Sequence, residues 1–445
     1  MCRVIMVGSS PNQPLAGREQ STAMRRPTFE PRGGRAMWWH RVLLMIAFTI
    51  AGLAGPVRAQ SIGYELRLPD ERMLGRFGLH MLWWSHATVD PGRAVVRHVS
   101  VDEEMVLIQS STGVLTAFDA ETGKKHWAVQ IGSPHASSFP PVTNDDYVLA
   151  TSGKRVHAVD KFNGQIRWLL DLPKQPSTGV STDDDQLYVG TLDGSVLAFD
   201  LRKVLHHSDE GLLPQFTMDT LNWRYRAAKT ITSPPLSFRQ TVYFASLDKS
   251  LYALNRLERT LRWQLESDAA VTAPLAQARD GAVVLASEDE TVYCVNPNGR
   301  VRWEFMAGYP IHRAPRVIES EVYVFPDDGG VFCLSLVSGR ELWHRPHIVD
   351  FIGATRYRVF VRDIYNNVVM LSRSDGTVLG VMPLRNFTVS FGNVRTDRIY
   401  LVTSRGLVVG IRERDAEFPR YFLYPERQPL VPELVDETDE QAAEN

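Results

Sequence analysis

The chain has 445 residues, of which 10% are aromatic and 22% are charged, and its formal net charge is -2. Residues 1–59 hold eight arginines and two acids, whereas residues 426–445 hold seven acids and one arginine. The long segment between them is close to neutral. This balance argues against nonspecific nucleic-acid binding, which needs a basic face to neutralise phosphates, although it is compatible with a local basic patch.

The N-terminal region contains a predicted export signal. Residues 1–36 are rich in Arg, Gly and Pro, so we expect them to be disordered or to lie upstream of the true translation start. Residues 37–59 combine a short basic beginning, an apolar run from Val42 to Ala54 and small residues at the end. This pattern predicts a signal peptide cleaved after Ala59 and a mature chain in the periplasm or secreted medium. An uncleaved anchor is the alternative, but the apolar run is short for a membrane span.

The residues after the predicted cleavage site bear on lipidation. Bacterial lipoproteins carry their lipid on a cysteine at that position, whereas this chain has Gln60 and Ser61. We therefore expect no lipid anchor. Residues 60–96 then form an N-terminal segment that contains a predicted strand, Leu79 to Val89, with the aromatic pair Trp83 and Trp84.

A repeated unit dominates the rest of the chain. Its clearest copy, Ala117 to Trp127, has a strand ending in Asp119, a Thr-Gly turn, and a second strand with Trp eight residues past the Asp. This order predicts a β-hairpin. The Asp-equivalent positions are 119, 160, 200, 255, 296, 335, 372 and 412. Eight units at a period near forty predict an all-β fold over residues 97–424, an eight-bladed β-propeller of four-stranded antiparallel blades.

The repeated tryptophans are expected to be structural. A large flat ring fills the widening space between wedge-shaped blades, and its indole N–H can bond a neighbouring carbonyl. The alternative is an exposed stacking platform for a base or a sugar. The docking residues predicted in this way are Trp127, Trp168, Trp223, Trp263, Trp303 and Trp343.

The last units lose parts of the pattern. Gly380 stands where the seventh unit should have Trp, and no Trp-bearing strand follows Arg412. We expect Trp83 or Trp84 to supply the missing outer strand, which would join the two ends of the chain and remove an open sheet edge. The competing interpretation places Phe418 to Tyr424 there.

The repeat resembles the tryptophan-docking motif of the pyrroloquinoline-quinone (PQQ) repeat family, Ala-x-Asp-x-x-Thr-Gly-x-x-x-Trp. Ala117 to Trp127 and Cys333 to Trp343 keep its full spacing. The resemblance implies a propeller. The family that this repeat resembles includes quinoprotein dehydrogenases as well as a non-enzymatic branch similar to the outer-membrane assembly factor BamB. The BamB-like proteins are lipidated, whereas this chain has Gln60 in place of the cysteine that would carry the lipid.

One insertion interrupts the repeat between Leu201 and Leu221. It carries apolar residues on an otherwise polar excursion, and loops on a rigid scaffold often carry recognition. We therefore predict that Leu212, Leu213 and Phe216 help to form a partner-binding edge. The alternative is a loop that folds back on its own blade.

Few residues suggest catalysis. Quinoprotein dehydrogenases use calcium with acidic and amide ligands and often a pair of adjacent cysteines, and no such pair or compact Asp-rich calcium loop occurs here. Asp183 to Asp185 is a candidate cation site but suits a turn better, and His206-His207 lacks the fixed geometry of a metal site. Cys294 and Cys333 occupy one repeat position and are expected to be small buried residues. We assign no catalytic, cofactor-binding or metal residue.

The C-terminal residues 425–445 are acidic and poor in aromatics, so we expect a disordered tail. The whole pattern predicts an exported, non-catalytic scaffold that binds one or more proteins, in association with the cell envelope. The alternative functions are a PQQ- or metal-dependent oxidoreductase, another enzyme that uses the propeller's central funnel, and binding of a small molecule or glycan.

Overall fold

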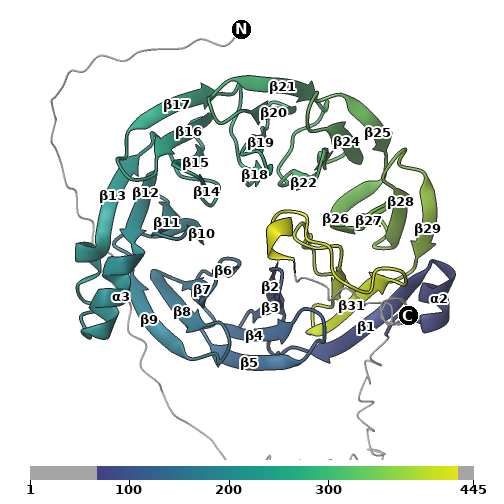
Figure 1. Ribbon diagram of the computed structural model, residues 1–445, viewed down its shortest axis with the longest axis horizontal. Coiled ribbons are helices and arrows are strands. Elements are labelled where there is room, and N and C mark those ends of the chain that lie inside the picture. The colour runs from purple at the N-terminus through teal and green to yellow at the C-terminus, as the bar shows by residue number, and fades with distance from the viewer. Residues whose placement is uncertain (1–67, 429–445) are drawn as a thin grey trace, which may run out of the picture. The chain divides into compact units, whose positions relative to one another are not determined.

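The computed structural model describes residues 68–428 as eight small antiparallel sheets around a common axis (Figure 1). The predicted eight-bladed β-propeller is therefore confirmed. Seven blades have four strands, which follow the chain from the innermost to the outermost position. The predicted signal peptide at residues 37–59 and residues 429–445 of the predicted tail lie outside the described residues. Pro425–Arg427, at the start of that predicted tail, form a 3-10 turn.

The first four blades are regular. Blade 1 consists of β2 (Val96–Val101), β3 (Met105–Ser110), β4 (Val114–Asp119) and β5 (Lys125–Gln130). Blade 2 consists of β6 (Val142–Thr143), β7 (Tyr147–Ser152), β8 (Arg155–Asp160) and β9 (Ile166–Asp171). Blade 3 consists of β10 (Pro176–Thr182), β11 (Gln186–Thr191), β12 (Ser195–Asp200) and β13 (Leu221–Arg226). Blade 4 consists of β14 (Leu236–Phe238), β15 (Thr241–Ser246), β16 (Ser250–Asn255) and β17 (Leu261–Glu266).

The remaining blades complete the ring. Blade 5 consists of β18 (Ala276–Gln277), β19 (Val283–Ala286), β20 (Thr291–Val295) and β21 (Val301–Met306). Blade 6 consists of β22 (Arg316–Ile318), β23 (Glu321–Val324), β24 (Val331–Ser335) and β25 (Glu341–Arg345). Blade 7 consists of β26 (Ile348–Ala354), β27 (Arg358–Asp363), β28 (Val368–Ser372) and β29 (Val378–Met382). Blade 8 consists of β30 (Ile399–Val402), β31 (Leu407–Glu413) and β1 (Leu79–His86).

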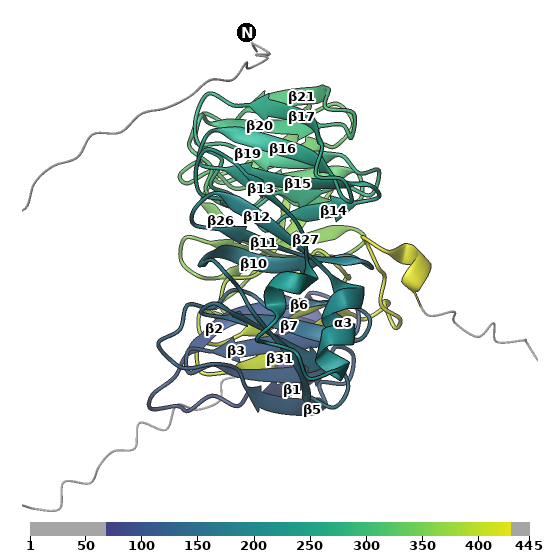
Figure 2. The same ribbon diagram turned by 90° about the vertical axis from the view of Figure 1, so that its left-hand side faces the viewer.

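Short helices lie outside the sheets. They are α2 (Glu71–Arg76), α3 (Leu201–Asp209), and the 3-10 turns η1 (Thr217–Thr220) and η2 (Pro425–Arg427). The turns after the first and third strands of each blade share one face of the ring, and α3 replaces one of these turns. We call this the α3 face. Figure 2 shows α3 and η2 on the same side of the propeller.

Blade 8 is closed by the N-terminal strand, as predicted. β1 pairs antiparallel with β31, from Leu79 opposite Glu413 to His86 opposite Leu407. The innermost position of this blade is irregular, with one bond from Val389 N–H to the carbonyl of Val402 at 3.2 Å. The Arg362 guanidinium of blade 7 donates to the Phe387 and Val389 carbonyls of this inner segment.

The tryptophans join each blade to the next through their indole N–H groups. Each Nε1 donates to the carbonyl of the residue that follows the next blade's turn Asp or its equivalent, at 2.7 to 3.0 Å. The donor and acceptor pairs are Trp83 with Ala120, Trp127 with Lys161, Trp223 with Arg256, Trp263 with Pro297, Trp303 with Leu336, and Trp343 with Arg373. Trp168 is buried without a partner for its Nε1.

Two repeat positions are kept small by this docking. Gly339 has φ 69°, and a Cβ built there would lie 2.6 Å from the Trp303 ring, so the turn needs glycine for both its backbone and its space. Within a blade, the small residue before the bulge lies opposite the Trp, as Cys294 does for Trp303 and Cys333 for Trp343. Both cysteines are free and buried.

Blade 7 has a substitute for its missing Trp. Gly380 occupies the Trp position of β29, opposite Met370. Phe77, at the end of α2, fills the space, because a Cβ on Gly380 would collide with its ring. The N-terminal region therefore repairs blades 7 and 8 with different residues.

We predict that Trp303→Phe lowers the free energy of unfolding by about 1–2 kcal/mol more than Trp168→Phe. The first change removes an indole N–H bonded to the Leu336 carbonyl, whereas the second removes a donor that has no partner. Urea denaturation of both variants measures the difference. Equal losses of stability would contradict a role for the indole hydrogen bond in holding blades together.

Candidate functional site

The insertion forms a helix rather than the loop that we expected. Asp200 caps α3, accepting the N–H groups of Arg202 at 2.9 Å and Lys203 at 3.3 Å. Leu201 and Val204 are buried on its inner side, since they lie three residues apart on one face of the helix. They pack in a cluster with Trp168. α3 therefore covers the seam between blades 2 and 3.

The three predicted partner residues have different surroundings. Leu213 packs against the cluster under α3, and Leu212 is half-buried. Phe216 is 49% exposed, and Met218 in η1 is 53% exposed. The insertion thus folds back on its blade through Leu213 while it keeps an apolar outer edge at Phe216 and Met218.

The Asp183–Asp185 turn of blade 3 holds α3 and blade 4 together. Asp183 Oδ2 accepts the Tyr188 hydroxyl at 2.8 Å and lies 3.2 Å from Arg256 of blade 4. Asp185 contacts Arg256 at 2.8 Å and Arg202 of α3 at 3.3 Å. These arginines supply the positive charge that a cation would otherwise provide.

The acidity of Asp183 reflects the same contacts. Burial would raise the pKa of this carboxyl, but hydrogen bonds from Ser237, from the backbone N–H groups of Asp185 and Gln186, and from Tyr188 outweigh burial and lower it. The lowered pKa means that the folded protein stabilises the ionised form.

The histidine pair is also engaged locally. His206 Nε2 lies 3.4 Å from Glu210, and His207 Nδ1 lies 3.0 Å from the Lys203 carbonyl. Within residues 68–428, no group of three or more His, Cys, Asp or Glu side chains is placed to hold a metal ion.

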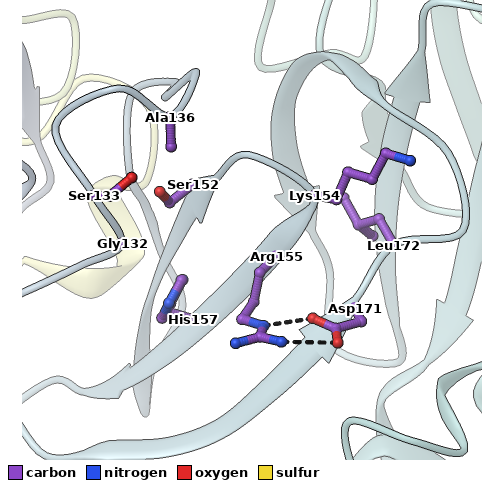
Figure 3. A pocket seen from close by; sticks show the side chains of 9 residues that line it. All are labelled: Gly132, Ser133, Ala136, Ser152, Lys154, Arg155, His157, Asp171 and Leu172. Carbon is purple, nitrogen blue, oxygen red and sulfur yellow. Dashed lines mark hydrogen bonds and ion pairs between the residues drawn. The ribbon is translucent and has the colours of Figure 1, made fainter.

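A surface cleft of about 640 Å³ lies on the opposite face, between blades 1 and 2 (Figure 3). Arg155 and Asp171 lie opposite each other on the neighbouring strands β8 and β9 and form a two-point ion pair, with one contact at 2.9 Å. Burial lowers the pKa of His157 at its floor. The cleft therefore offers a neutral imidazole and a guanidinium that is already neutralised, which suits a polar surface better than acid–base catalysis.

The C-terminal segment crosses the α3 face near the ring axis (Figures 1 and 2). Phe422 is buried in a cluster with Phe351 of blade 7, and Tyr421 donates its hydroxyl to the Glu103 carbonyl of blade 1 at 3.4 Å. Arg427 lies 3.2 Å from Asp145 of blade 2. Phe418 to Tyr424 therefore straps the ring across one face, whereas the competing prediction placed it in the outer strand of blade 8.

The inner strands present few charged groups near the axis. Arg316 of β22 has its pKa lowered by burial, partly offset by Asp350 of β26. Asp350 in turn accepts a hydrogen bond from the hydroxyl of Ser390.

No helix of the described part of the chain combines the length and apolar character needed to cross a bilayer.

The profile of the family described as outer membrane protein assembly factor BamB matches residues 111–218 and 248–351. BamB from Bordetella pertussis is 24% identical over 247 residues, which cover 52% of this chain and 59% of that protein. BamB from Burkholderia pseudomallei is 25% identical over 239 residues, covering 49% and 58%. This chain is a PQQ-like β-propeller related to BamB. It spans a little under three fifths of the length of these relatives.

Solved structures agree with the fold of this BamB-related propeller. BamB from Moraxella catarrhalis superposes with a TM-score of 0.58 at 14% identity, covering 76% of this chain and 98% of that structure. The computationally designed Ika8 protein gives a TM-score of 0.57, also at 14% identity, covering 73% and 98%. At these identities the likeness describes architecture alone.

We predict that Asp183→Asn destabilises the protein by about 1–3 kcal/mol at pH 7, because charge-assisted hydrogen bonds are weakened. The folded-state pKa of Asp183 is lowered, so its contribution is fully present above the unfolded value near 3.8 and disappears as the pH falls below that value. Denaturant midpoints at pH 7, 5 and 3 measure this trend. Asp184→Asn, at the exposed middle of the turn, is the control and should have little effect.

The strap gives a second stability prediction. Phe422→Ala should cost about 3–5 kcal/mol, because it empties a buried aromatic site between blades. Phe418→Ala removes the same side chain from a position that is 53% exposed and should cost much less. Thermal unfolding of the two variants compares them, and similar losses would show that the segment does not brace the ring.

Proposed function

We propose that this chain is an exported, non-catalytic scaffold that binds protein during envelope assembly. The match to the BamB family profile carries the proposal, since its first stretch, residues 111–218, includes most of the α3 insertion. The function in the names of the relatives, outer membrane protein assembly, supplies the process. A propeller scaffold suits such a role because its rigid ring presents many loops on two faces.

Export to the periplasm is part of the proposal. Its support is the basic, apolar and small-residue order of residues 37–59. Gln60 at the predicted mature N-terminus implies a protein without a lipid anchor, so its attachment to the envelope depends on protein partners.

The α3 insertion is the proposed contact edge. It displays Phe216 and Met218 to solvent, and Arg202 and Lys203 are exposed on the helix of the same insertion. Apolar side chains with flanking charges are typical of surfaces that bind other proteins. Leu213 anchors this edge to the blade from within, and Leu212 is half-buried.

A graft tests the proposal without opening the ring. Residues 201–220 are replaced by Ala-Glu-Thr-Gly-Lys, the sequence that joins Asp119 to Lys125 in blade 1. This turn should restore an acceptor for Trp168 and preserve folding, because its geometry is the one used in the other blades.

We expect tagged wild-type protein to capture outer-membrane assembly proteins from a cross-linked envelope extract, and the grafted protein to lose them. Mass spectrometry identifies the captured proteins, and circular dichroism with thermal unfolding checks that the graft folds. Equal capture by both proteins would remove α3 as the contact edge. Absence of envelope proteins from the wild-type capture would contradict the proposed function.

A further inference from the structure

A groove of about 560 Å³ runs between α3 and blade 2. One wall is Leu205, Ser208 and Asp209 of α3. The other wall comes from two turns of blade 2 and from its strands β7, β8 and β9. Its residues are Asp146, Tyr147, Asp160, Phe162, Arg167 and Trp168. The groove exists because the insertion replaces a tight turn with a helix. This helix packs on the Trp168 cluster through Leu201 and Val204 and carries its later residues past the edge of blade 2.

The groove has an excess of negative charge. Asp160 is paired with Arg167 at 2.8 Å. Asp146 and Asp209 line the groove with their side chains exposed, and neither has a basic partner among residues 68–428. The pKa of Tyr147 between them is raised by burial and then by Asp146, Asp160 and Asp209. Two unpaired carboxylates on facing walls favour a cationic occupant.

The same groove is rich in aromatic surface. Phe162 is 65% exposed, and the rings of Tyr147 and Trp168 lie edge to face with centroids 6.1 Å apart. Aromatic faces bind apolar side chains and also the cationic groups of Arg and Lys. A small inorganic cation would use the carboxylates but not this apolar surface.

Trp168, at the base of the groove wall, has lost the acceptor that the other docked tryptophans use. Its side chain is 4% exposed, yet its Nε1 has no hydrogen-bond partner. In the other blades the acceptor is the carbonyl one residue after the turn Asp, which here belongs to Leu201. Leu201 begins α3, and the carbonyl of a first helical residue accepts the N–H four residues later. The indole N–H is therefore left without an acceptor, at a buried position that a ligand in the groove does not reach.

We propose that this groove binds a basic segment of a partner protein, with an Arg or Lys side chain between Asp146 and Asp209 and a neighbouring apolar side chain on Phe162. The inference rests on the proposed protein-binding function and names the chemistry that one of its sites recognises. A phosphate-bearing ligand is disfavoured, because the unpaired charges in the groove are negative.

The probe is a fluorescein-labelled, amidated peptide in which leucine alternates with arginine, titrated with the full mature protein by fluorescence anisotropy at about 150 mM salt. Two matched peptides replace arginine with glutamate or leucine with serine. We expect saturable binding of the first peptide, none of the glutamate peptide, and about fivefold weaker binding of the serine peptide.

The protein variants separate the groove from general surface charge. Asp146→Asn with Asp209→Asn should weaken binding about tenfold, and Phe162→Ala about fivefold. Glu210→Gln is the control for the change at Asp209, because it removes one carboxylate charge from the next residue in the chain. Glu210 pairs with His206 outside the groove. It should bind as wild type does.

Several results would overturn the inference. These are failure of the arginine peptide to bind, equal affinity of the Asp146 and Asp209 double variant, equal loss in Glu210→Gln, equal binding of the serine peptide, and displacement by spermidine at the peptide's own concentration. Envelope capture that persists without peptide binding would remove this groove and leave the proposed function. Peptide binding by a protein that captures no envelope partner would uphold the groove and remove the proposed function.

Discussion

The indole wedge between neighbouring blades is the interaction on which this ring depends. Each docked Trp fills the space between two sheets and also ties its blade to the next blade's turn, as Trp303 does at the Leu336 carbonyl. A large aromatic ring is required to fill the space between the sheets. A glycine such as Gly339 is required beneath the ring so that the indole can approach the turn. One contact therefore constrains two repeat positions at once, the Gly and the Trp. Because a closed ring needs such a contact at nearly every seam, the pattern survives where the rest of each unit has diverged.

The ends of the repeat show what happens where the pattern fails. Phe77 fills the space over Gly380, and Trp83 docks on Ala120 from a strand that comes from the other end of the chain. Arg398 of blade 8 is fully buried and contacts Glu121 of blade 1 at 2.8 Å. Asp397 of the same blade also contacts Arg398 at 3.2 Å, so closure of the ring adds a second carboxylate to this buried charge. The strap that carries Phe422 adds contacts from the blade 7 cluster to blades 1 and 2. Ring closure is thus concentrated at one seam.

Repetition explains how much the sequence could predict. The period, the blade number and the closing strand with Trp83 follow from comparing one unit with another. Phe77 could not be found in this way, because it replaces Trp from outside the repeat and has no spacing in common with it. α3 left a signal that was available, the cap at Asp200 followed by Leu201 and Val204 on one face. The groove left none, since Asp146, Phe162 and Asp209 come from three separate segments that only the ring brings together.

The α3 insertion sets stability against recognition. A Thr-Gly turn after Asp200 would have given the Trp168 indole N–H a carbonyl acceptor. Because α3 begins there instead, the indole N–H has no acceptor. A buried donor without a partner costs about 1–3 kcal/mol. The ring can tolerate this loss because it is largely confined to one of the eight blades. In return, the helix places Asp209 across a groove from Asp146 and Phe162 of blade 2, an arrangement that a tight turn would not give. A local defect in the docking pattern is thus informative in a repeat protein, because packing between blades maintains the pattern elsewhere. An interruption of the pattern marks the blade where a requirement other than ring closure was stronger.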